Sequence, residues 1–223
     1  MYEYVGPSKY VPIRKDVEQN LFQKANWYLD VKYCFKFNAN LIGSAGRHVV
    51  TRIKNSNEGF DLDFDLIIPK SVSKILSPKE IKDAFMNAFN CAVGGTLWEY
   101  PRNSTSVITI PHRTSEGEKE CSIDLAIVFD DGAGRHCLKV DKTKIPHGYS
   151  FEIRPHSSNL HKKVKVIKSK KMMKQVRNEY LKRKNDSKYS DKPSRLIYSE
   201  VINDIYNHIQ QIKNNNSKSN GKR

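Results

Sequence analysis

The stretch Phe60-Asp61-Leu62-Asp63-Phe64-Asp65-Leu66-Ile67-Ile68 decides how this chain is expected to fold. Apolar and acidic residues alternate, which is typical of a β-strand, because side chains two positions apart leave a strand on the same face. Asp61, Asp63 and Asp65 therefore share one face, where neighbouring carboxylates repel one another. A divalent cation such as Mg²⁺ would balance them. The alternative is an edge strand with one solvated face, which explains the alternation but not an Asp at every polar position.

A second acidic strand is predicted around Asp124. Residues 122–128 read Ser-Ile-Asp-Leu-Ala-Ile-Val, and a single carboxylate in such an apolar run is costly to bury without a partner. If the two strands are neighbours, Asp124 joins two of the first three aspartates. Two metal ions held by three carboxylates support in-line displacement at phosphorus. We therefore predict a catalytic metal site here.

The third element of the pattern is Gly43-Ser44, directly after a predicted strand over residues 35–42. Small residues allow a tight turn, and the amides of that turn, with the Ser44 hydroxyl, can hold phosphate oxygens. A Gly-Ser pair alone carries little information. Its position 19 residues before Asp63 makes it a candidate phosphate-binding turn.

The remaining patterns predict an α+β domain with a mixed sheet. Expected helices cover residues 15–33 and 77–92, the second opened by an N-cap Ser77 and Pro78. Expected strands cover 35–42, 60–68, 96–100, 106–110 and 121–129. This core is expected to span residues 1–156. A basic helical lobe would follow over 157–213, helical to about 184 and again from Ser194, and then a disordered tail over 214–223.

Charge is unevenly distributed along the 223 residues. The net charge is +15, and residues 160–223 hold 18 Lys and Arg against 5 Asp and Glu. Such a region attracts polyanions, among them a nucleoside triphosphate or a nucleic acid; a solvated helix face with a basic tail is the plainer alternative. No run approaches the length of a membrane span and the first residues lack an apolar signal segment, so a cytoplasmic protein without a membrane partner is expected.

At this point the sequence resembles a known family. Residues 41–44 (Leu-Ile-Gly-Ser), 63–68 (Asp-Phe-Asp-Leu-Ile-Ile) and 123–125 (Ile-Asp-Leu) resemble the DNA polymerase β-type nucleotidyltransferase pattern. Within that superfamily the chain is most similar to the branch of cyclic GMP-AMP synthase, the oligoadenylate synthetases and the bacterial cyclic-oligonucleotide synthases. The loop over residues 43–51 and the basic helices of the last third carry this closer likeness.

The resemblance implies roles for named residues. Asp63 and Asp65 would hold two Mg²⁺ or Mn²⁺ ions, because they lead directly into an apolar run, and Asp61 is the alternative in register. Asp124 would complete the site. The NTP phosphates would be bound by Gly43 and Ser44 together with two basic-lobe positions, Lys174 and Ser194, Lys171 being an alternative to Lys174. We expect Asp65→Asn to abolish turnover while leaving folding nearly intact.

The implied activity is transfer of a nucleoside monophosphate from an NTP, such as ATP, to an acceptor hydroxyl with release of pyrophosphate. The product would be an oligonucleotide or a cyclic nucleotide. One alternative is a toxin-like enzyme that nucleotidylates tRNA or protein; another is a non-catalytic RNA- or DNA-binding protein that uses the basic lobe. The chain is shorter than typical cyclic-oligonucleotide synthases, which leaves the acceptor open.

Overall fold

The computed structural model describes residues 1–144, 146–154 and 159–220, with side chains to residue 214. The chain divides into two compact units, Glu3–Pro155 and His156–Arg223 with Met1–Tyr2. The larger unit is the predicted α+β core, and its mixed sheet with covering helices confirms the expected fold class. In the described part of the chain no helix is both long and apolar enough to cross a membrane.

The sheet of the larger unit has the strand order β2-β4-β7-β6-β5, and β8 and β9 extend it beyond β7. Its central pair, β4 (Phe60–Ile67) and β7 (Lys119–Asp131), is parallel, whereas the other pairs are antiparallel. The other strands are β2 (Asn38–Leu41), β5 (Arg102–Asn103), β6 (Ile108–Arg113), β8 (Gly134–Asp141) and β9 (Gly148–Ile153). Strands β1 (Tyr2–Tyr4) and β3 (Thr51–Ile53) form a separate two-stranded sheet.

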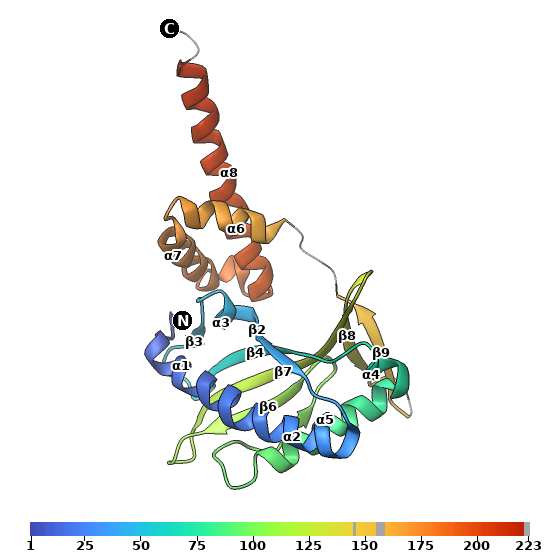
Figure 1. Cartoon of the computed structure of the whole chain (residues 1–223). Helices are drawn as coiled ribbons and strands as arrows, with labels where there is room; N and C mark the ends of the chain where they lie inside the picture. Colours follow the sequence, from blue (N-terminus) through green and yellow to red (C-terminus); the bar gives the residue numbers. More distant parts are fainter. Residues whose placement is uncertain (145, 155–158, 221–223) are drawn as a thin grey trace. The chain divides into compact units, whose positions relative to one another are not determined.

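Helices cover one face of this sheet (Figure 1). A continuous helical segment runs through α1 (Pro7–Asp16), η1 (Val17–Leu21, a π-helix) and α2 (Phe22–Tyr33). Helix α5 (Pro78–Ala92) packs beside α2 and has the predicted N-cap Ser77, which forms a capping box with Glu80. Two short helices, α3 (Gly43–Gly46) and α4 (Val72–Ile75), follow β2 and β4.

The apolar residues of β4 face these helices. Leu62, Phe64 and Leu66 are fully buried. The Phe64 and Phe22 rings pack edge to face, with their centroids 5.1 Å apart. In β7, Ile123, Leu125 and Ile127 extend the same core. Burial of this face against α2 and α5 fixes the register of both strands, because a slip of one residue would turn every aspartate into the core. The acidic residues are thereby held on the opposite face.

Several described elements of the larger unit differ from the expected ones. The predicted strand over 96–100 is reduced to a single bridge between Trp98 and His112, since the Gly94-Gly95 turn and Pro101 bracket it. The first helix begins at Pro7 rather than near residue 15, because the helix continues through Pro12. The hairpin of β8 and β9 was not predicted at all.

The described residues of the smaller unit form helices α6 (Leu160–Ser169), α7 (Met173–Lys184) and α8 (Ser194–Asn220), with a short 3₁₀ turn over Ser187–Tyr189. The predicted helix over 157–184 is interrupted at Lys171, which has a φ of 57°. Helix α8 buries Ile197, Val201, Ile202, Ile205 and Ile209. It continues through residues 214–220, where a disordered tail was expected; residues 221–223 lie outside the described residues.

Candidate active site

The parallel register of β4 and β7 places Asp63 directly opposite Asp124. Asp61 lies opposite Ser122, whose hydroxyl donates a hydrogen bond to Asp61 Oδ1, and Thr109 of β6 donates to Asp124 Oδ1 at 2.6 Å. Burial, with repulsion from Asp124 and Asp61, raises the pKa of Asp63 from 3.8 to about 6. Burial also raises the pKa of Asp124, and Asp61 adds to that shift. The three carboxylates thus form one site with excess negative charge.

The Gly43 turn lies directly against this site. Gly43 has a φ of +62°, and a Cβ added there would come within 1.8 Å of Asp63 Oδ2. Only glycine therefore satisfies both the backbone conformation and the contact. The Ser44 amide, which was expected to hold phosphate, donates a hydrogen bond to the Asp63 carboxylate. The turn and the acidic strand are thus in direct contact through Gly43, Ser44 and Asp63.

Asp65 occupies a different environment from its two neighbours. Its side chain is 1% exposed, and it accepts hydrogen bonds from Arg135 Nη1 at 2.7 Å and from Arg154 Nη1 at 2.8 and 2.9 Å. Arg135 also binds Asp130 with two hydrogen bonds of 2.8 Å. Two guanidinium groups already balance the Asp65 charge and occupy both of its oxygens. This environment differs from the metal-ligand role expected of Asp65. Among the residues that the structure describes, Asp61 and Asp63 form no such ion pair with an arginine.

The acidic site fits divalent cations by its chemistry, although its side chains are not yet gathered around one point. Hard carboxylate oxygens are the ligands that Mg²⁺ and Mn²⁺ prefer. The raised pKa values of Asp63 and Asp124 show that their negative charge is not fully balanced by nearby groups, so a cation would stabilise the ionised carboxylates. Arg47 and Lys119 offset part of that charge. Within the described residues, no three His, Cys, Asp or Glu side chains form a preassembled metal-binding group. Small side-chain movements of the three aspartates would therefore accompany metal binding.

Sequence reasoning missed four residues of this site. Thr109 and Ser122 orient the carboxylates, and Arg135 and Arg154 neutralise Asp65. Ser122 was detectable, since it precedes Asp124 by two positions on the same strand face. The arginines were not, because they come from the unpredicted β8–β9 hairpin.

The other predicted phosphate-binding residues belong to the smaller unit. Lys171 lies in the turn between α6 and α7, Lys174 in the first turn of α7, and Ser194 at the start of α8. All three are exposed to solvent. Gly43, Ser44 and the aspartates belong to the larger unit.

Comparison with known proteins identifies the fold. No protein-family model and no curated protein matches the sequence. Among solved structures, the Vibrio cholerae cyclic AMP-GMP synthase DncV bound to the linear intermediate pppA(3′,5′)pG matches with a TM-score of 0.52 and 12% identity, over 76% of this chain and 47% of that one. The chain shares the fold of this nucleotidyltransferase structure. The match confirms the fold that the resemblance implied from the Gly-Ser and aspartate motifs.

Two further structures with the nucleotidyltransferase fold are similar. The GTP-bound form of DncV matches with a TM-score of 0.50 and 11% identity, over 89% of this chain and 52% of that one. The cyclic dinucleotide synthase CdnE of Elizabethkingia meningoseptica with GTP and Apcpp matches with a TM-score of 0.47 and 13% identity, over 87% and 74%. The chain spans about half the length of the DncV structures.

Proposed function

We propose that this chain is a metal-dependent nucleotidyltransferase that transfers a nucleoside monophosphate from an NTP to an acceptor hydroxyl and releases pyrophosphate. The observation that supports it best is the cluster of Asp61, Asp63 and Asp124, held on one face of the sheet by the β4–β7 register, with Gly43 packed against Asp63. Three carboxylates beside a glycine turn suit phosphoryl transfer, in which the protein mainly positions groups and balances charge.

Asp61, Asp63 and Asp124 are the proposed metal ligands, in place of the pair Asp63 and Asp65. Two Mg²⁺ or Mn²⁺ ions would lower the pKa of the acceptor hydroxyl and balance the charge that develops on the leaving pyrophosphate. Ser122 and Thr109 restrain the carboxylates through hydrogen bonds, so that fewer side-chain conformations are lost on binding. Asp65 is proposed to anchor Arg135 and Arg154 instead of binding a metal.

Triphosphate binding is assigned to two groups of residues. Gly43 and Ser44 follow β2, and the Ser44 hydroxyl remains the proposed phosphate contact, since its amide is bound to Asp63. Lys171, Lys174 and Ser194 are retained for the triphosphate on the family resemblance alone. The similar structures of DncV and CdnE contain GTP, a linear dinucleotide or an ATP analogue, which favours an NTP as substrate here.

The favoured product is an oligonucleotide or a cyclic nucleotide, because the DncV structure that matches with a TM-score of 0.52 is bound to a linear dinucleotide intermediate. An enzyme that modifies tRNA or protein is the alternative product class. To distinguish them, the purified protein is incubated with each α-³²P-labelled NTP and Mg²⁺ or Mn²⁺, with and without total RNA. Label in small molecules supports the signal-nucleotide synthase, and label in RNA or protein supports a modifying enzyme.

The matched variants in that assay are Asp63→Asn and Asp65→Asn. The proposal requires that label disappear in Asp63→Asn, whereas folded Asp65→Asn retains some of it. Label that survives Asp63→Asn would contradict the metal site. If no NTP gives aspartate-dependent label under any condition, the enzymatic proposal fails.

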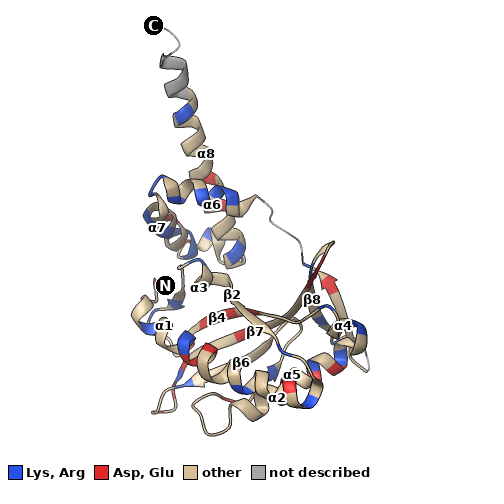
Figure 2. Cartoon of the chain, viewed as in Figure 1, with Lys and Arg blue, Asp and Glu red and all other residues tan. Residues whose placement is uncertain are grey.

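The second candidate is a non-catalytic protein that binds nucleic acid, because the smaller unit carries a high positive charge. Lys and Arg occur at many positions along α6 and α7 (Figure 2). Phosphate contacts by such residues release counterions, so the affinity for RNA should fall steeply as salt increases. Equal RNA affinity at low and high salt would exclude this electrostatic mode of binding.

A further inference from the structure

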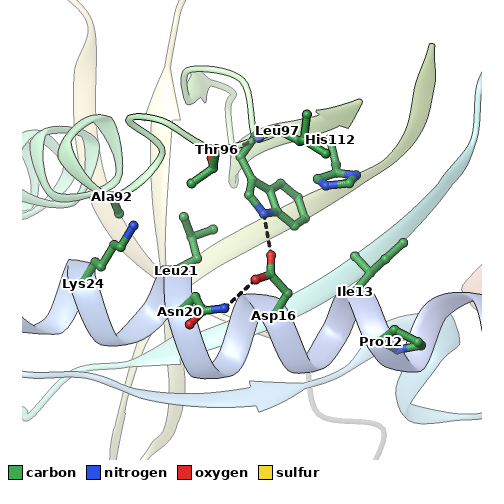
Figure 3. A pocket seen from close by; sticks show the side chains of 11 residues that line it. Pro12, Ile13, Asp16, Asn20, Leu21, Lys24, Ala92, Thr96, Leu97 and His112 are labelled. Carbon is green, nitrogen blue, oxygen red and sulfur yellow. Dashed lines mark hydrogen bonds between the residues drawn. The ribbon is translucent and has the colours of Figure 1, made fainter. Parts of the chain in front are cut away.

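A pocket of about 480 Å³ lies on the helix-covered face of the sheet, between the first helical segment and the chain that follows α5 (Figure 3). Its volume falls within the range of small-molecule sites. The acidic residues lie on the other face: Ile110 and Ile123 of the β6–β7 pair point into the core, His112 shares their face, and Asp124 does not. The pocket is therefore distinct from the aspartate site.

A π-helix shapes one wall of this pocket. In an uninterrupted α-helix, Lys24 would be turned about 80° away from Asp16, at about 100° per residue. The π segment Val17–Leu21 absorbs roughly one residue, which reduces this offset to about 20°. Asp16, Asn20 and Lys24 consequently project from the same side of the helix toward the pocket (Figure 3). With one residue absorbed, Asp16 and Lys24 are about 10 Å apart along the axis, at about 1.5 Å per residue.

The opposite wall is apolar and held in place by hydrogen bonds. Thr96 accepts from the Trp98 amide at 3.1 Å and donates to the Val93 carbonyl at 2.7 Å, which fixes the loop carrying Leu97 and Trp98. The Trp98 ring is 6% exposed and lies 4.5 Å from the His112 ring. With Leu21 and Ile13, these side chains give walls suited to a flat ring.

The polar groups define what the ligand must present. Asp16 Oδ2 accepts from the Trp98 indole N–H at 3.0 Å and Oδ1 accepts from Asn20 at 2.6 Å, so each carboxylate oxygen keeps a further lone pair. Two adjacent acceptors match two adjacent N–H donors. Within the described part of the chain neither Asp16 nor Lys24 makes an ion pair, so the ammonium of Lys24 can bind an anionic group.

We propose that this pocket binds a small planar heterocycle with two adjacent N–H donors, joined to an anionic group. The donor edge would lie on Asp16, the ring between Leu21, Leu97 and Trp98, and the anion at Lys24. The separation of Asp16 and Lys24 suits a mononucleotide. GMP is the probe with these features, since guanine presents an N–H and an amino group side by side. AMP lacks that donor pair and guanosine lacks the anion.

The test uses tryptophan fluorescence of the full chain. The sequence has two tryptophans, so Trp27→Phe leaves Trp98 as the only indole. GMP should change its emission in a saturable way, after correction for light absorbed by the nucleotide against free tryptophan. AMP and guanosine should bind at least about tenfold more weakly. No saturable change at millimolar GMP, or an equal response to AMP, would overturn the proposal.

Variants in the Trp27→Phe background separate this pocket from the aspartate site. Lys24→Gln changes an exposed side chain, and Asp16→Asn keeps an acceptor for the Trp98 indole while removing the charge. Each should weaken GMP binding by about tenfold, whereas Asp63→Asn should leave it unchanged. Binding that survives both pocket variants, or that is lost in Asp63→Asn, would contradict the assignment. Thermal melting of each variant controls for folding.

Discussion

Arg154 holds the carboxylate of Asp65 through Nη1, 2.8 Å from Oδ1 and 2.9 Å from Oδ2. Asp65 is buried, whereas the guanidinium groups of Arg154 and Arg135 are partly exposed. Two of the three alternating aspartates thus face a shared excess of negative charge, and the third is neutralised. This asymmetry makes their replacement a direct test of which carboxylates act in the reaction.

Asp61→Asn and Asp65→Asn should have opposite effects. Asp61→Asn removes repulsion within the acidic site, so folding is expected to remain intact while turnover is lost. Asp65→Asn leaves two arginines without their buried partner and should lower the free energy of unfolding by about 1–3 kcal/mol, less than for a fully buried pair because the arginines are partly solvated. Urea denaturation and labelled-NTP turnover measure the two effects. A stable but inactive Asp65→Asn would restore Asp65 as a metal ligand.

Gly43→Ala should disturb the site more than the fold. Both Gly43 and Gly95 have positive φ, of 62° and 71°, so alanine at either position is expected to cost about 1 kcal/mol of stability. Only at Gly43 does the new Cβ collide with Asp63; at Gly95 nothing lies within 4 Å. Turnover should therefore fall by about a hundredfold or more in Gly43→Ala, if the displaced carboxylate misplaces the reacting groups. Equal activity of the two variants would argue against the coupling of turn and strand.

Divalent cations should stabilise the folded chain independently of any substrate. A ligand that binds only the folded state raises the free energy of unfolding, and saturating Mg²⁺ or Mn²⁺ is expected to raise the melting temperature by about 3 °C or more over EDTA. The increase should vanish in Asp63→Asn and persist in Asp65→Asn, provided that the latter folds. Differential scanning calorimetry with and without metal measures it. An equal increase in wild type and Asp63→Asn would place the cation elsewhere.

Because Lys82 is buried, we expect the free energy of unfolding to depend on pH. Its Nζ donates to the Val107 carbonyl at 3.0 Å, and burial lowers its pKa from 10.5 to about 8. Between these values the unfolded chain binds the proton that the folded chain releases, so stability rises as pH increases from 8 to 10.5. Lys82→Met should therefore exceed wild type in stability at pH 7 by at most about 3 kcal/mol, at about 1.4 kcal/mol per pKa unit, with the gap closing toward pH 10.5.

Urea unfolding of Lys82→Met and wild type across this pH range tests the prediction, since the comparison cancels other groups that titrate there. The lost hydrogen bond to Val107 would reduce the gain at pH 7 by about 1 kcal/mol. A gap that stays constant from pH 7 to 10.5 would show that Lys82 does not titrate with folding.

The sequence was sufficient for the parts of the site that follow from alternation. Alternation of apolar and acidic residues over 60–66 predicted β4, and the lone Asp124 in an apolar run predicted its acidic neighbour. The sequence alone could not decide which of Asp61, Asp63 and Asp65 to propose as metal ligands. That choice depends on Arg135 and Arg154, which lie 70 and 89 positions from Asp65 along the chain. No local pattern reports such distant partners.

Helix geometry shows the same limit. The N-cap Ser77 before Pro78 follows from local sequence alone and was predicted. The π segment at residues 17–21 was not, because side-chain periodicity over so short a stretch does not distinguish one extra residue in a turn.

The parallel pairing of β4 and β7 has a consequence for how the chain acquires its site. Asp63 and Asp124 are 61 positions apart, and α4, α5, β5 and β6 lie between their strands in the sequence. Such non-local pairing forms slowly, because a long loop must close before any contact rewards it. The proposed cation site would therefore be absent from a nascent or partly folded chain, and cation binding would report completion of the central sheet.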